Sequence, residues 1–181
     1  MGLTGTPGTG KKSIAPLLAS LLGIPSVSID GEARRTGALS EEGADLLVDT
    51  ERLSRVSMEE TGRRLVFGHL LTEAVDQRAL EVAIVLRCEP ETLKERLRRR
   101  RYPEPKVLEN VEAELIGYLA AQARQRFGPS RVHEFDTTTT TPRDAAKRIF
   151  DEVSFGTTRK KAIDWTYDYD SAPRLRSLLE R

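Results

Sequence analysis

The chain has 181 residues, of which 29 are Lys or Arg and 28 are Asp or Glu, so its net charge is +1. Hydrophobic residues make up 38% of the sequence and charged residues 31%, which is typical of a globular protein and excludes a disordered chain. The balanced charge excludes a globally basic nucleic-acid binder. A single cysteine, Cys88, excludes an intramolecular disulfide and favours a reducing compartment.

Neither a membrane span nor an export signal is apparent. No apolar run approaches the roughly 18–20 residues that cross a bilayer, and the amino terminus has no signal-peptide pattern. We therefore expect a soluble, cytoplasmic protein without membrane contact. Its length fits one domain with a full core, with or without an insert.

The pattern of apolar residues predicts strands that alternate with helices. Residues 1–4 supply a short first strand, and the helical spacing of apolar residues from Lys11 predicts a helix that Gly23 ends. The clearest strand lies within 81–87, because its continuous apolar run is typical of a strand covered on both faces. Such alternation implies an α/β protein with a parallel sheet flanked by helices.

The remaining elements follow the same alternation. Pro90 opens a helix. Apolar residues recur every fourth position from Val107 to Phe127 and predict one long helix there. We also expect strands at 26–29, 64–68 and 132–135, a mostly helical segment at 51–62, and helices that begin after Thr141 and at Pro173.

Residues 5–11 form the most informative motif of the chain. Their sequence, Gly-Thr-Pro-Gly-Thr-Gly-Lys, matches the G-x-x-x-x-G-K part of a phosphate-binding loop between a first strand and a first helix. The glycines let backbone N–H groups face phosphate oxygens at the helix amino terminus. Lys11 can reach the outer phosphates and offset the charge that develops there during transfer. Pattern and context together disfavour a purely structural glycine turn and predict a P-loop NTPase fold.

The residue after Lys11 departs from this motif. The motif places a Ser or Thr there, whose hydroxyl binds Mg²⁺, but this chain has Lys12, with Ser13 one place later. Either Ser13 takes over the metal, or water and other groups hold it. Lys12 can also add positive charge toward the phosphates.

Residues 94–106 form an arginine-rich segment with seven positive and two negative side chains, including the four consecutive arginines 98–101. In a phosphotransferase, such arginines close over the transferring group and neutralise its oxygens. In a nucleic-acid binder they contact the backbone instead. A third reading is a solvated helix end, where cations suit the helix dipole. The phosphate loop favours the first reading.

These segments together resemble a known family. Thr4–Lys11 resembles the opening of the atypical adenylate kinases, known as adenylate kinase isoenzyme six or coilin-interacting nuclear ATPase, and most of all that of their archaeal branch. Arg96–Glu114, with Arg100-Arg101-Tyr102 and Glu109-Asn110-Val111, is similar to the family's lid and the helix after it. Val85-Leu86-Arg87 and Phe135-Asp136-Thr137-Thr138 are similar to two of its strands.

The resemblance implies a P-loop kinase domain over 1–153, with an NMP-binding insert at about 28–51 and a short lid at about 99–109. It implies transfer of the terminal phosphoryl group from ATP to AMP, with Mg²⁺ as cofactor and with ATPase activity. It also implies a role in small ribosomal subunit maturation, through transient pre-ribosome contact and a platform ribosomal protein as partner. The resemblance places ATP contacts at Gly8, Gly10, Lys11, Lys12, Ser13 and Arg100. Together with the loop motif it predicts Thr9 as a further contact, Lys11 and Arg100 as catalytic, with Arg96 or Arg99 assisting, and Ser13 at the metal.

Two further positions depart from the family. Its lid usually has Gly where this chain has Arg101. Its second catalytic motif has an acidic or small residue two places before a histidine, but here Phe67 precedes His69. An acid would hold magnesium through water, and Phe cannot. Two alternatives therefore stay open: an ATP-gated ribosome-assembly factor with weak or no kinase activity, and a kinase for another small acceptor.

Residues 154–181 follow the last helix of the predicted kinase domain. Trp165, Tyr167 and Tyr169 alternate with polar residues and predict an extended tail segment packed on the core. The alternative is a docking strip for a partner. Acidic neighbours favour a protein over RNA, because they repel phosphate.

Overall fold

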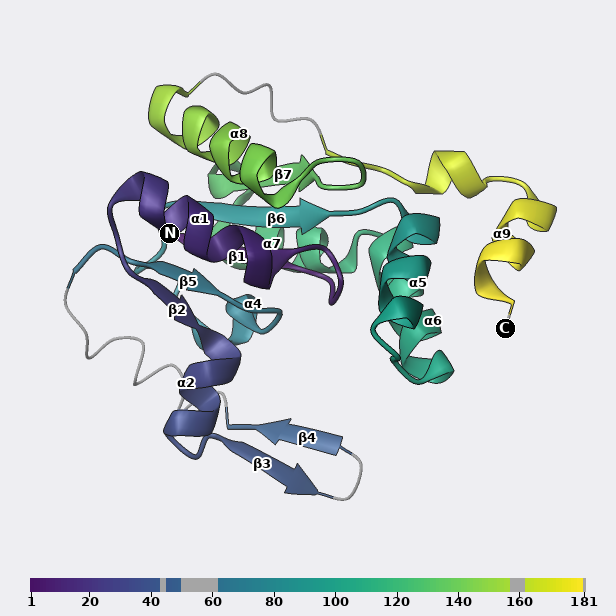
Figure 1. Cartoon of the computed structure of the whole chain (residues 1–181), viewed down its shortest axis with the longest axis horizontal. Helices are drawn as coiled ribbons and strands as arrows, with labels where there is room; N and C mark the ends of the chain where they lie inside the picture. Colours follow the sequence, from purple (N-terminus) through teal and green to yellow (C-terminus); the bar gives the residue numbers. More distant parts are fainter. Residues whose placement is uncertain (43–44, 50–61, 157–161, 181) are drawn as a thin grey trace.

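The computed structural model describes residues 1–42, 45–49, 62–156 and 162–180. Five parallel strands form its sheet in the order β2-β5-β1-β6-β7 (Figure 1). Helices flank the sheet, as predicted. The strands are β1 (Gly2–Gly5), β2 (Ser26–Ser28), β5 (Leu65–Phe67), β6 (Ala83–Arg87) and β7 (Val132–Asp136).

Each face of the sheet carries its own apolar core. Helices α1 (Lys11–Leu22) and α8 (Pro142–Phe155) cover one face, where Ile84 and Leu86 of β6 are buried (Figure 1). Helices α4 (Leu71–Ala74) and α7 (Tyr118–Phe127) cover the other, where Ala83 and Val85 are buried. Strand β6 is therefore covered on both faces, as its continuous apolar run predicted.

A third apolar cluster lies beyond the carboxyl ends of the strands. It joins α5 (Pro90–Arg99), α6 (Glu104–Leu115) and α9 (Ala172–Leu179) (Figure 1). Leu97 of α5, Val111 of α6 and Leu178 of α9 are buried in it. The tail helix expected from Pro173 is thus present, and it packs against the arginine-bearing helix.

The prediction of a single long helix after Lys106 is wrong, because the helix is interrupted between α6 and α7. Gly117 there has φ +66°, a left-handed conformation that glycine adopts without strain. A side chain would also crowd the site, since a Cβ at Gly117 would lie 3.3 Å from Arg87 Nη1. Apolar residues recur every fourth position on both sides of this interruption, so the sequence pattern does not indicate it.

The extended tail segment predicted around Trp165 is also wrong. Residues Thr166–Tyr169 form a short 3-10 helix, η2. Tyr169 is buried, but Tyr167 is 79% exposed, so the alternating aromatics do not share one face. Alternation over so few residues did not distinguish a strand from a tight helical turn.

Between β2 and β5 the chain forms α2 (Ile29–Arg35) and an antiparallel hairpin of β3 (Leu39–Glu42) and β4 (Asp45–Val48). This hairpin lies apart from the main sheet (Figure 1). Most of the helical segment expected at 51–62 lies outside the described residues. None of the helices in the described part of the chain is long and apolar enough to cross a membrane.

Candidate active site

The phosphate loop connects β1 to α1 at the carboxyl edge of the sheet. Gly10 forms the amino-terminal cap of α1. Gly8 has φ +97°, and a Cβ there would lie 2.6 Å from Leu93 Cδ1 of α5, so glycine alone fits. The loop therefore packs directly against the helix that carries the arginines.

Lys11 is the first residue of α1, and its ammonium lies over the loop. Its Nζ donates hydrogen bonds to the carbonyl oxygens of Gly5 and Thr6, the latter at 3.1 Å. The pKa of Lys11 is lowered to about 8, chiefly by burial; the charges of Asp30 and Glu114 oppose this shift, whereas those of Lys12 and Arg100 contribute to it. Phosphate oxygens beside Nζ would favour its charged form.

Of the other residues predicted to contact ATP, some are buried within the loop and others are exposed on α1. Thr9 is buried, and its Oγ1 donates to Thr6 O at 2.8 Å. Lys12 and Ser13 lie exposed in the first turn of α1. Lys12 Nζ is 3.9 Å from Asp30 Oδ2. Both exposed side chains are thus available to a ligand at the start of the helix.

Asp30 and His69 form a pair at this edge that the sequence interpretation did not assign to the site. Asp30 follows β2 and His69 follows β5, and these strands are neighbours in the sheet. His69 Nδ1 lies 3.5 Å from Asp30 Oδ1, and this contact holds the pKa of Asp30 below its usual value. Their shared position after paired parallel strands was the signal that could have revealed them.

Phe67 is buried among the residues of the sheet face that α1 covers. It offers no ligand to the site, as its side chain predicts. Asp30, near Lys12 and with an electrostatic effect on Lys11, supplies a carboxylate in this region instead.

The arginines of α5 have different partners. Arg96 donates to the carbonyl oxygens of Thr137 and Thr138 at 2.9 and 2.8 Å, so it anchors α5 to the loop after β7. Arg98 pairs with Glu104, and Arg99 lies 3.3 Å from Glu95. These three guanidinium groups are therefore engaged within the protein.

Arg100 differs from its neighbours. It is exposed, and its guanidinium has no hydrogen-bond or ion-pair partner among the described residues, although its backbone N–H donates to Arg96 O and Leu97 O. Its charge nevertheless acts on Lys11. Unlike Arg96, Arg98 and Arg99, Arg100 therefore has a guanidinium that is available to a bound phosphate; Arg101 is exposed as well.

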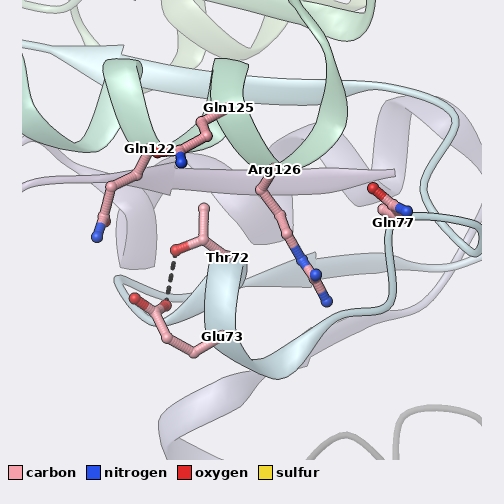
Figure 2. Close-up of a pocket in the computed structure, with 6 residues that line it drawn as sticks. All are labelled: Thr72, Glu73, Gln77, Gln122, Gln125 and Arg126. Atoms are coloured by element: carbon pink, nitrogen blue, oxygen red, sulfur yellow. Dashed lines mark hydrogen bonds between the residues drawn. The ribbon is translucent and has the colours of Figure 1, made fainter.

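A separate polar pocket lies between α4 and α7, away from the loop. Figure 2 shows Thr72 and Glu73 on one side of it and Gln122 on the other, with Thr72 Oγ1 hydrogen-bonded to the Glu73 carboxylate. Its volume is about 380 Å³, and its lining includes none of the predicted site residues. The candidate active site is therefore defined by the loop and not by this pocket.

The side-chain oxygen atoms near the loop suit the binding of a magnesium ion. Within the described residues, no group of three or more His, Cys, Asp or Glu side chains could enclose a metal. Mg²⁺ does not require such a cage, because it usually keeps several waters and binds through one or two protein oxygens plus phosphates. The exposed Ser13 hydroxyl and the Asp30 carboxylate are donors of that kind.

Comparisons with known proteins place this chain in a family. A family model described as an AAA domain matches residues 1–117. The "Putative adenylate kinase" of Thermococcus onnurineus is 34% identical over 172 residues, which cover 94% of this chain and 93% of that protein. The "Adenylate kinase isoenzyme 6 homolog" of Caenorhabditis elegans is 33% identical over 146 residues, covering 76% and 79%.

Solved structures share the fold. A shikimate kinase from Acinetobacter baumannii in complex with shikimate aligns with a TM-score of 0.60 and 20% identity, over 87% of this chain and 94% of that one. At this identity the likeness shows the P-loop kinase fold alone. It confirms the predicted fold class, and the relatives above confirm the family that the loop and the arginine-rich segment resemble. The chain belongs to the atypical adenylate kinase family, that of isoenzyme 6 and its archaeal relatives.

Proposed function

We propose that the chain is a nucleoside monophosphate kinase that transfers the terminal phosphoryl group of ATP to AMP. The observation that carries the proposal is the placement of Lys11 over the phosphate loop, with the exposed Arg100 close enough to affect its pKa. Two such cations suit a transferring phosphoryl group, whose equatorial oxygens carry the developing charge. The names of the relatives agree with kinase chemistry on nucleotides.

The reaction needs no nucleophilic side chain. Amides of the loop and the Lys11 ammonium would bind the donor phosphates, while Arg100 would clamp the group in transfer. Ser13 and Asp30 would hold Mg²⁺, which neutralises phosphate charge when it is bound with ATP. Gly8, Thr9, Gly10 and Lys12 complete the proposed nucleotide contacts.

The segment 28–51 is the proposed acceptor-binding insert, and 99–109 the proposed lid. Transfer of labelled γ-phosphate from ATP to a panel of AMP, GMP, CMP, UMP and shikimate tests the choice of acceptor. We expect the label in ADP. Label in another product with none in ADP would assign the chain to a different acceptor.

A second candidate function is an ATP-gated factor in small ribosomal subunit maturation that hydrolyses ATP slowly. The exposed Lys12 after the loop lysine and the buried Phe67 favour it, because both stand at positions expected to serve magnesium. Binding to the platform protein of the small subunit, measured with and without ATP, tests this function. ATP-dependent release without AMP-dependent ADP formation would support it over the kinase.

A further inference from the structure

A buried carboxylate lies behind the phosphate loop. Glu114, near the end of α6, has a side chain that is only 2% exposed. Its oxygens accept hydrogen bonds from Thr6 Oγ1 at 2.6 Å, Arg87 Nε at 2.7 Å, the Cys88 amide at 3.0 Å and Trp165 Nε1 at 3.3 Å. The partners come from the loop, the end of β6 and the tail, so one side chain joins three distant parts of the chain.

Thr6 is the member of this set that belongs to the loop. Its carbonyl oxygen accepts hydrogen bonds from Lys11 Nζ at 3.1 Å and from Thr9 Oγ1 at 2.8 Å. Its hydroxyl donates a hydrogen bond to the Glu114 carboxylate. Glu114 therefore acts on the position of Lys11 through a single residue.

Arg87 fixes the Glu114 carboxylate in place. Besides its bond to the carboxylate, its Nη2 donates to the backbone oxygen of Glu114 at 2.8 Å, and its Nη1 donates to Glu134 and to Ile163 O. The left-handed turn at Gly117 leaves room for this guanidinium. Charged hydrogen bonds of this kind restrict both partners to one geometry.

We propose that Glu114 is a positioning residue, which holds Thr6 and thereby sets the loop and Lys11 for the donor phosphates before ATP binds. Trp165 of the tail supports the same carboxylate. A preorganised loop loses less conformational entropy when it binds phosphate, so it binds phosphate more tightly. The proposal rests on the proposed kinase function for its kinetic readout, but nucleotide binding tests it without any acceptor.

The test removes the Thr6 hydroxyl while nearly preserving the side-chain volume. We expect Thr6→Val to weaken binding of a fluorescent ATP analogue by at least about fivefold and to lower kcat by at least about tenfold. Thr6→Ser keeps the hydroxyl and should restore both values to within about twofold of the parent. Analogue binding by Thr6→Val at the parental level, or a loss in Thr6→Ser equal to that in Thr6→Val, would overturn the proposal.

Thr4 offers a matched control. It is buried in β1, and its hydroxyl has no hydrogen-bond partner among the described residues. Thr4→Val should leave analogue binding unchanged, and a loss as large as that in Thr6→Val would overturn the proposal, because the effect would not depend on the bond to Glu114.

Trp165→Phe tests the share of the tail and leaves the loop intact, so it keeps the proposal testable if Thr6→Val does not fold. It should weaken analogue binding about twofold to threefold, in keeping with one lost hydrogen bond. Unchanged binding would contradict the proposal, because a weaker hold on the Glu114 carboxylate would then not reach the loop. A parent protein that binds the analogue but does not phosphorylate AMP would refute the kinase function, while a Thr6→Val defect in binding would still support the role of Glu114.

Discussion

The ammonium of Lys94 lies 2.6 Å from the carbonyl oxygen of Leu178, at the carboxyl end of the last helix. It also donates to Glu180 O at 2.8 Å. These carbonyls end a helix and lack partners within it, so a cation there satisfies them and suits the helix dipole. Lys94 thus fastens α9 to α5, the helix against which the phosphate loop packs.

Replacing Lys94 with Met should free the tail. We expect Lys94→Met to lower the free energy of unfolding by about 2 kcal/mol, because the buried Leu178 carbonyl and the Glu180 carbonyl lose a charged donor. Amide exchange in α9 should accelerate more than exchange in β6. Lys147→Met, at an exposed position of α8, serves as the control. Unaltered exchange in α9 would show that Lys94 does not anchor it.

The affinity for ATP should depend on pH through Lys11. Its pKa in the nucleotide-free protein is lowered to about 8, whereas bound phosphates favour the charged ammonium. Above about pH 8 the free protein has lost this proton and must regain it on binding, so affinity falls as the pH rises. Calorimetry in buffers of different ionisation enthalpy should detect proton uptake at pH 8.5 in the parent.

Lys11→Met provides the control for this effect. The variant should bind ATP more weakly and lack the component of proton uptake that belongs to Lys11. Equal proton uptake by parent and variant would assign the titration to another group.

Lys11 and Arg100 should both matter for turnover. We expect Lys11→Ala or Arg100→Ala to lower turnover by at least about tenfold, which corresponds to about 1.4 kcal/mol of barrier. Arg98→Ala should stay within about twofold of the parent, since that arginine is paired with Glu104. Steady-state ADP formation measures all three, and parental rates in both site variants would show that the assignment of the site is wrong.

Arg101 should be a point of stored strain. Its φ of +59° is left-handed, which costs a residue with a side chain about 1 kcal/mol relative to glycine. Arg101→Gly should therefore raise the free energy of unfolding by about that amount in urea titrations. Arg99→Gly, at the last residue of α5, should lower it, because glycine is less favourable than arginine in a helix. If both changes lowered the free energy of unfolding, this result would contradict backbone strain at Arg101.

The local parts of this site could be predicted from sequence. The phosphate loop is a contiguous motif whose glycines and lysine act together, and β6 and the start of α5 carry clear apolar and proline signals. Arg100 was predicted because the phosphate loop indicated that the arginines of residues 94–106 contact phosphate. The loop, β6 and the start of α5 needed only neighbouring residues, whereas Arg100 also needed the distant loop and the resemblance to a family.

The long-range parts could not be predicted in this way. Arg87 and Glu114 are 27 positions apart, and a strand that ends in arginine does not indicate which carboxylate it meets. The break at Gly117 interrupts an apolar repeat that continues on both sides. Asp30 and His69 meet because β2 and β5 pair in the sheet, a consequence of topology and not of spacing.

The central claim is the transfer of phosphate from ATP to AMP. ADP formation from ATP and Mg²⁺, measured with and without AMP on the purified chain, tests it most directly. We expect AMP to raise ADP formation many-fold, with two ADP formed for each AMP consumed. Slow ADP formation that AMP does not change would contradict the kinase function and leave a nucleotide-gated factor on a kinase fold.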